Sequence, residues 1–154
     1  LGLFLGWFYN HNKEKRAIEA VIYNANLCQF NTFKKLPILD TTSIDSFYVQ
    51  KGNSRSSIIT VLLGSIKGNR VIAQPHHNPS FFKILSTEIL SMKDTSAIVQ
   101  TTEHWFLKWY DYKAQRYTIS YDVKNNQLYE LVKEGDRWLI LNDFFEGKAT
   151  TIDY

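Results

Sequence analysis

The spacing of apolar residues changes once along this chain, from the period of a helix to the period of a strand. In the first half, apolar residues recur three or four positions apart, which is typical of one face of a helix. From Phe81 onward, apolar and polar residues alternate, which is typical of a strand with one buried side. The pattern therefore predicts an α+β domain whose helices precede an antiparallel sheet and pack on one of its faces.

Three helices are expected before the sheet. The first covers Ala17–Phe30, a short one carries the apolar residues of 44–48, and a third covers the apolar stripe of 58–66. The pair Gly68-Asn69 ends the third helix, and residues 74–80 contain two of the three prolines, so they form a loop. Five strands follow, separated by turns at 92–95, 111–115, 125–126 and 135–136. They are expected over residues 81–89, 97–110, 116–123, 127–133 and 137–144.

Composition narrows the classes of function. Aromatic residues make up 15% of the chain, and such residues favour strands but also line ligand pockets. The net charge of +3 is scattered along the chain, which argues against a nucleic-acid partner because such partners need a concentrated basic face. Cys28 is the single cysteine, so an internal disulfide and a cysteine-based zinc site are excluded. No cofactor-binding motif is present, and no cofactor is expected.

Residues 1–16, LGLFLGWFYNHNKEKR, form a distinct segment ahead of a single domain over residues 17–154. The first nine residues are mostly apolar, about half of the ~20 that a membrane span needs. Two interpretations stay open: the inner end of a membrane anchor followed by cytoplasmic basic residues, or the first part of a packed helix. In both, residues 1–9 are helical and lead into Ala17–Phe30, since no proline occurs before Pro37.

Three segments of the second half, EHWFLKWYD, RYTISYDV and QLYELVKEGDRWLILNDFF, resemble the long curved strands of the NTF2-like superfamily, also called SnoaL-like or ketosteroid-isomerase-like. The run GDRWLI, from Gly135 to Ile140, is similar to the closing hairpin of that fold. The resemblance covers residues 17 to 145 and implies a cone, with N-terminal helices packed on a curved antiparallel sheet. The fold hosts enzymes, binding modules and assembly domains, and membrane-anchored bacterial members share this layout of anchor, helix and cone.

Glu103 lies among apolar residues on one side of its expected strand. If Tyr110 pairs with Arg116 across the turn, Glu103 faces Val123 and the odd-numbered residues of both strands share one face. The expected pocket residues are Glu103, Trp105, Trp109, Tyr117 and Tyr121. On the same face, the helix residues Val21, Ile22, Val61 or Leu62 are expected to pack against Trp105, Leu107, Ile119 and Tyr121.

Two interpretations of Glu103 are open. In the first it is a pocket acid or base that acts on a carbonyl compound. In the second it is a structural group that accepts hydrogen bonds and ties the helices to the sheet. Both require Glu103 to be buried and held by at least one donor. The resemblance adds little, because the acidic base and the Tyr/Asp oxyanion donor of isomerase-like members cannot be matched residue by residue here.

His104 and Asp122 form a second candidate catalytic pair, on the other face of the same two strands. A histidine oriented by a carboxylate can act as a base or a metal ligand, but a cross-strand pair of this kind also simply stabilises a sheet. His76-His77 lies in the proline-flanked loop without the spacing of a metal site. No metal site is therefore expected.

Two functions from different classes fit the sequence. The first is a non-catalytic binding or assembly domain that uses an aromatic-lined concave sheet or pocket to engage a protein partner or further copies of itself. The alternative is a small-molecule enzyme or carrier with Glu103 in its pocket, for which a small apolar ligand is a candidate. An open cavity with a second titratable group near Glu103 favours the alternative. The segment of residues 1–9 leaves a membrane-associated and a cytoplasmic location open.

Overall fold

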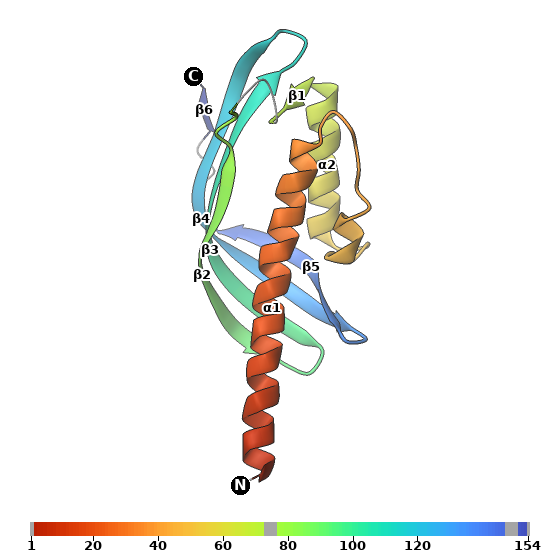
Figure 1. Ribbon diagram of the computed structural model, residues 1–154, viewed down its shortest axis with the longest axis vertical. Helices are drawn as coiled ribbons and strands as arrows, with labels where there is room; N and C mark the ends of the chain where they lie inside the picture. The colour runs from red at the N-terminus through yellow and green to blue at the C-terminus, as the bar shows by residue number, and fades with distance from the viewer. Residues whose placement is uncertain (1, 73–76, 147–150, 154) are drawn as a thin grey trace.

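The computed structural model describes residues 2–72, 77–146 and 151–153. Its helical part consists of α1 (Gly2–Lys34), the short 3-10 helix η1 (Ile44–Ser46) and α2 (Asn53–Lys67). These elements match the three expected helices, but α1 is far longer than Ala17–Phe30. Gly2 to Tyr9 continue the same helix, as expected, and extend beyond the end of the sheet (Figure 1).

The described part of the chain has no helix that is both long enough and apolar enough to cross a membrane. The apolar stretch at the start of α1 ends where its polar and charged residues begin, at Asn10.

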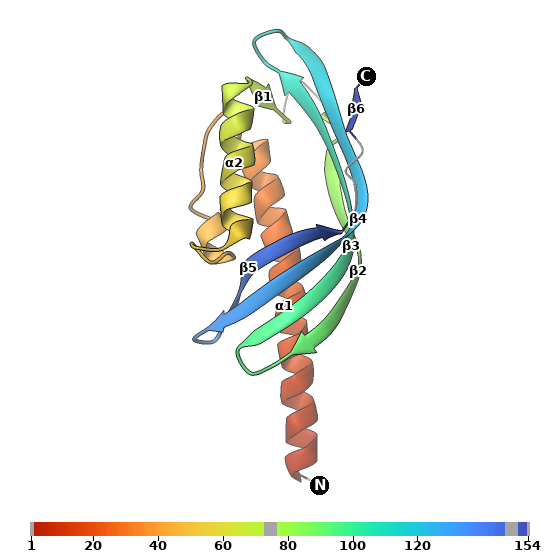
Figure 2. The ribbon, with the colours of Figure 1, turned by 180° about the vertical axis from the view of Figure 1, so that it is seen from behind.

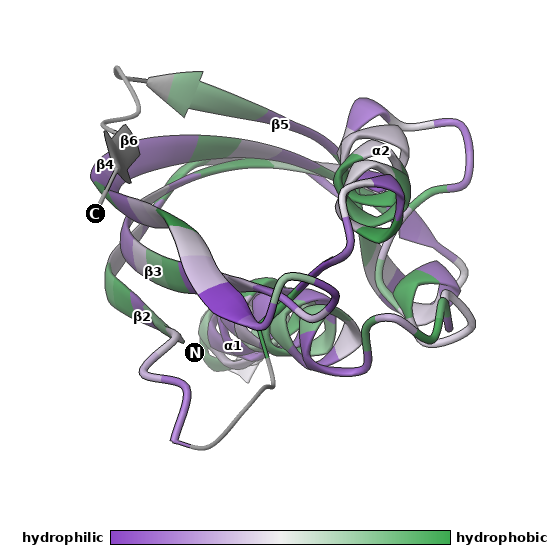
Figure 3. Cartoon of the chain, turned by 90° about the horizontal axis from the view of Figure 1, so that it is seen from above, coloured by the Kyte–Doolittle hydropathy of each residue, from purple (hydrophilic) through white to green (hydrophobic). Residues whose placement is uncertain are grey.

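Six antiparallel strands form one sheet: β1 (Arg70–Val71), β2 (Phe81–Met92), β3 (Ser96–Asp111), β4 (Arg116–Glu134), β5 (Arg137–Glu146) and β6 (Thr151–Asp153). The two long strands β3 and β4 pair along most of their lengths and form the centre. Both β1 and β2 pair with β3, while β5 and β6 pair with β4. The sheet curves, and both helices lie on its concave side (Figures 1, 2 and 3).

The turn expected at Asn125-Asn126 is wrong, because β4 runs unbroken through both residues. Asn125 pairs with Glu103 and Asn126 pairs with Thr102 on β3. The inward alternation continues without a change of phase through Tyr121, Val123, Gln127 and on to Leu131. A hairpin would have ended that alternation, so the strand partner outweighs the turn preference of the two asparagines.

The register of β3 against β4 also differs from the expected one. At the turn, Asp111 pairs with Arg116, and a bulge between Lys108 and Tyr110 then brings Leu107 opposite Tyr121. A bulge places two residues of one strand opposite one residue of the other. The combined shift is two residues, so the faces assigned to Trp105 and Leu107 are still correct.

The core lies between the helices and the concave face of the sheet. Ile18 and Ile22 of α1 and Leu62 of α2 are fully buried in the same cluster as Trp105 and Leu107, as expected. Val21 and Tyr121 pack at the edge of this cluster and Ile119 lies outside it. Val61 was expected in the core but is 46% exposed, because its side of α2 lines an open pocket.

Glu14 ties α1 to the turn between β4 and β5. Its carboxylate accepts hydrogen bonds from the Trp138 indole N–H at 2.6 Å and from Lys133 Nζ at 3.0 Å. These two donors hold the pKa of Glu14 below its usual value, the indole bond contributing most. These hydrogen bonds fix α1 across the sheet, and the first turns of the helix, before Glu14, extend beyond the sheet.

Candidate functional site

A pocket of about 630 Å³ opens between α1, α2 and the concave face of the sheet. The volume lies within the range of ~300 to 1,000 Å³ typical of small-molecule sites. Glu103, Trp105 and Trp109 from β3 line it together with Tyr121 from β4. The pocket that was expected from the pattern of β3 is therefore present, and it is open rather than filled by its aromatic side chains.

Glu103 lies at one end of this pocket and is 3% exposed. Its Oε1 accepts hydrogen bonds from Thr101 Oγ1 at 2.7 Å and from the Tyr129 hydroxyl, and its Oε2 accepts one from the Trp105 indole N–H at 2.9 Å. Asn26 of α1 donates in turn to the Tyr129 hydroxyl at 3.1 Å. The expectation that Glu103 is buried and held by donors is confirmed, and Tyr129 is a titratable group within hydrogen-bond reach.

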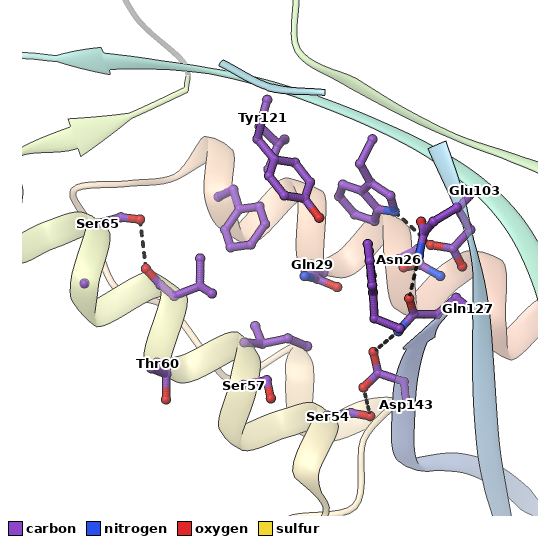
Figure 4. Close-up of a pocket in the computed structure, with 18 of the residues that line it drawn as sticks. Asn26, Gln29, Ser54, Ser57, Thr60, Ser65, Glu103, Tyr121, Gln127 and Asp143 are labelled. Atoms are coloured by element: carbon purple, nitrogen blue, oxygen red, sulfur yellow. Dashed lines mark hydrogen bonds between the residues drawn. The ribbon is translucent and has the colours of Figure 1, made fainter. Parts of the chain in front are cut away.

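Asp143 of β5 forms a second acidic group at the same end of the pocket (Figure 4). Its carboxylate accepts hydrogen bonds from Ser54 Oγ at the start of α2 and from Gln127 Nε2 at 2.6 Å. Burial raises the pKa of Asp143 above its usual value, although both hydrogen bonds act in the opposite direction. Tyr129 is the strand partner of Asp143 and also binds Glu103, so the two carboxylates lie on either side of one tyrosine.

One face of α2 forms the rim of the pocket. Ser57, Thr60, Val61 and Gly64 are three or four positions apart, line the pocket and are exposed, because this face looks onto open space rather than onto the sheet. A Cβ atom added at Gly64 would have no heavy atom within 4 Å. A Cβ atom at the pocket mouth is therefore accommodated without contact.

Tyr117 was expected to line the pocket but does not. At the turn Asp111, rather than Tyr110, pairs with Arg116, so the strand partner of Tyr117 is Tyr110 instead of Trp109. The Tyr110 and Tyr117 rings pack with centroids 5.3 Å apart. Lys108 Nζ lies 5.1 Å from the centroid of the Tyr117 ring. Tyr117 therefore belongs to a cluster near the β3–β4 turn.

His104 and Asp122 do come together, although not as direct strand partners. His104 pairs with Lys124 and Asp122 pairs with Phe106, but the diagonal contact leaves His104 Nε2 and Asp122 Oδ1 2.7 Å apart. Both side chains are partly exposed and neither lines the pocket. The described residues contain no group of three or more potential metal ligands. His76 lies outside the described residues.

Three polar pocket residues, Asn26, Gln127 and Asp143, were not identified from the sequence. Asn26 is inside the apolar stripe of the first helix, and a buried asparagine in such a stripe is itself a sign of a polar partner. Gln127 was assigned to a separate strand because of the false turn at 125–126. Asp143 carried no signal, since its position against α2 depends on the whole fold.

The raised pKa of Asp143 predicts how its contribution to stability varies with pH. Above its ordinary value of 3.8 the unfolded chain loses this proton before the folded chain does, so stability falls as pH rises to the folded pKa. We expect the stability of the wild type relative to Asp143→Asn to be greatest at and below about pH 4 and to decline as the pH rises above the ordinary pKa of 3.8. Urea denaturation at several pH values measures this difference.

Asp40 provides the control for this experiment. Hydrogen bonds from Thr42 and Lys35 lower its pKa to about 2, so it is ionised in both states above about pH 5. The stability difference between wild type and Asp40→Asn should be flat between pH 5 and 7. A stability difference between wild type and Asp143→Asn that does not fall at all as the pH rises above about 4 would contradict the prediction.

No protein-family model and no curated protein sequence matches the chain. The intermembrane space region of the chloroplast protein ARC6 has a similar structure, with a TM-score of 0.62, 12% identity, and coverage of 86% of this chain and 96% of that one. The association domain of C. elegans calcium/calmodulin dependent protein kinase II is similar at a TM-score of 0.53 and 11% identity, over 88% of this chain and 100% of that one.

A third similar structure is a putative association domain of the same kinase type from Xanthomonas campestris. It has a TM-score of 0.52 and 15% identity, with coverage of 84% of both chains. At these identities the similarity concerns the fold, and it extends over most of each chain. Two N-terminal helices on the concave side of a curled antiparallel sheet give this chain the α+β cone fold of NTF2-like proteins.

Proposed function

We propose that this chain is a non-catalytic binding or assembly domain whose pocket receives a group from a protein partner, either another copy of the chain or a different protein. The observation that carries the proposal is the state of Glu103. Its carboxylate accepts hydrogen bonds from Thr101, Trp105 and Tyr129, all of them fixed parts of the sheet. A carboxylate with this set of hydrogen bonds is held in place as a structural group of the sheet.

Two further observations support the proposal. The pocket rim on α2 is exposed, so a bulky group can enter from outside. Two of the structurally similar proteins are association domains by description, which supports an assembly role for the same fold without establishing one here.

The test is photo-cross-linking from the pocket rim. Thr60 is replaced by a photoreactive phenylalanine, and the chain is expressed in cells of its source. Two versions are compared, one that also carries Gly64→Ala and one that also carries Gly64→Phe. Alanine leaves the mouth open, whereas phenylalanine adds a ring to the pocket mouth from a position whose Cβ atom has no heavy atom within 4 Å. We expect a protein adduct with Gly64→Ala that is lost with Gly64→Phe. Equal adducts from both, or none from either, would contradict the proposal.

The alternative, a small-molecule enzyme or carrier, is favoured by one specific observation. The pocket is open and Tyr129 stands within hydrogen-bond reach of Glu103, which is the arrangement that a pocket acid or base needs. Native mass spectrometry of the purified chain distinguishes the two functions. A small molecule that co-purifies with the Gly64→Ala chain and not with the Gly64→Phe chain, without any protein adduct, supports the alternative.

The first turns of α1 provide a second contact surface, for which we propose membrane association. Leu3, Phe4 and Tyr9 are 94%, 68% and 73% exposed, and the helix is apolar on all sides over residues 2–9. A helix that is apolar all round is normally buried in a core or in lipid, and the basic residues of 13–16 follow at once. Flotation with phospholipid vesicles should depend on Phe4 and Trp7, and a Phe4→Ser/Trp7→Ser chain that floats equally well would contradict this.

A further inference from the structure

The charges that line the pocket are unevenly distributed. Glu103 and Asp143 lie at one end, and the other polar residues there are neutral amides and hydroxyls. The only basic residue that lines the described pocket is Arg70, whose Cζ lies 5.7 Å from the centroid of the Trp109 ring. Trp109 is six positions along β3 from Glu103, a distance of about 20 Å at ~3.3 Å per residue. The acidic end is therefore remote from the single cation.

Neither carboxylate has a basic partner among the described residues. The ion pairs of the described chain involve Asp40, Asp45, Asp122 and Glu14, and the donors to Glu103 and Asp143 are neutral. A buried charge is costly unless it is paired. A ligand with a positive charge would supply the basic partner that the described residues do not provide.

Glu103 retains room for one more donor. Its Oε1 accepts two hydrogen bonds and its Oε2 accepts one, and each carboxylate oxygen has two acceptor positions. Glu103 lines the pocket, so a donor within the pocket is the group placed to use the free position.

Aromatic rings next to the acidic end favour the same kind of ligand. Phe82 stacks on the Trp105 ring, with centroids 5.0 Å apart, and Trp105 lines the pocket. Tyr48 and Tyr121 line the same space. The faces of such rings attract organic cations, and an apolar stem can pack against the Leu107 and Ile58 side chains.

We propose that the acidic end of the pocket binds an organic cation, a protonated amine or a guanidinium on an apolar stem. The cation can be a lysine or arginine side chain of the protein partner, and in that case this proposal rests on the proposed function and adds the chemistry of the bound group. The same chemistry would also be met by a free small amine. Metal ions are a poorer fit, since no described group of three acidic, histidine or cysteine ligands exists.

The test compares three probes that share one ring and differ in charge: phenethylamine, phenylacetate and phenethyl alcohol. Binding is followed at pH 7 by NMR line shifts of the tryptophan indole N–H groups. We expect phenethylamine to bind about ten-fold tighter than either of the others, since a charge-assisted hydrogen bond is stronger than a neutral one. Glu103→Gln should remove most of that preference, and Gly64→Phe should abolish binding of all three.

Because Glu103→Gln also disturbs the internal hydrogen bonds, Asp143→Asn serves as a second variant and Glu88→Gln, on exposed β2 surface, as the control. Phenylacetate binding as tightly as phenethylamine, or an amine preference unchanged in both pocket variants, would overturn the proposal. A lysine-containing hexapeptide and its norleucine equivalent distinguish a side chain of a partner from a free amine.

The two proposals fail in different ways. If Gly64→Phe loses the protein adduct but phenethylamine binds no tighter than the other two probes, the proposed function is supported and the organic-cation proposal is rejected. Tight amine binding without any protein adduct would keep the cation and reject the protein partner, leaving a free small amine as the ligand.

Discussion

Replacing Gly52 with alanine is expected to lower the free energy of unfolding by about 2 to 4 kcal/mol. Gly52 is the N-cap of α2 and is buried against β5. A Cβ atom at this position would lie 1.9 Å from the Leu141 carbonyl oxygen. That oxygen belongs to the backbone of a strand, so α2 would have to move away from the sheet. Urea denaturation of the purified chain measures the loss.

Gly64→Ala is the matched control, because it makes the same chemical change in the same helix without a neighbour within 4 Å. It should stabilise the chain by about 0.5 to 1 kcal/mol, since alanine is a better helix former than glycine. A lower free energy of unfolding for Gly52→Ala together with a higher one for Gly64→Ala would show that the close approach of α2 to β5 limits the side chain at position 52. A Gly52→Ala chain within 0.5 kcal/mol of wild type would contradict the prediction.

The sequence was sufficient to predict the order and type of most elements, because their periods are long and regular. The helical stripe around Ile22 and the alternation along β3 each extend over several turns or residue pairs. Local pattern was a poor guide at Asn125-Asn126, where turn-favouring residues lie inside a strand of 19 residues. There the pairing with β3 on one side and β5 on the other decides the structure.

The candidate site was predictable in part for the same reason. Glu103, Trp105 and Trp109 follow from alternation along a single strand, and their shared face is confirmed. The placement of Tyr117 depended on the exact register at the turn, where Asp111 rather than Tyr110 pairs with Arg116. A register shift of one residue changes which residues of the two strands share a face, and the alternation of one strand alone does not reveal it.

The acidic partner on β5 could not have been predicted from the sequence. Asp143 is held by Ser54, 89 positions earlier in the chain, and no local pattern links residues so far apart. Its position depends on how α2 docks on the sheet, which is also what Gly52 controls. The charge of the pocket is therefore a property of the assembled fold.

Removing the charge of Glu103 tests whether this residue is structural or catalytic. In Glu103→Gln the amide oxygen can still accept hydrogen bonds from Thr101 and Tyr129, but the new N–H₂ group faces the Trp105 indole N–H, which is also a donor. We expect the free energy of unfolding to fall by about 1 to 3 kcal/mol. Glu103→Leu removes every acceptor and leaves several buried donors unpaired, so a loss of about 3 to 5 kcal/mol is expected.

Thermal and urea denaturation of both variants, with Glu88→Gln as a surface control, measure these losses. If Glu103 is structural, the leucine variant is the less stable of the two. If Glu103 is a pocket acid or base, the glutamine variant keeps near-normal stability and loses turnover of the bound molecule, because an amide cannot take up a proton. Stability equal to wild type in both variants would contradict the structural role, since three hydrogen bonds to a buried carboxylate cannot be removed without cost.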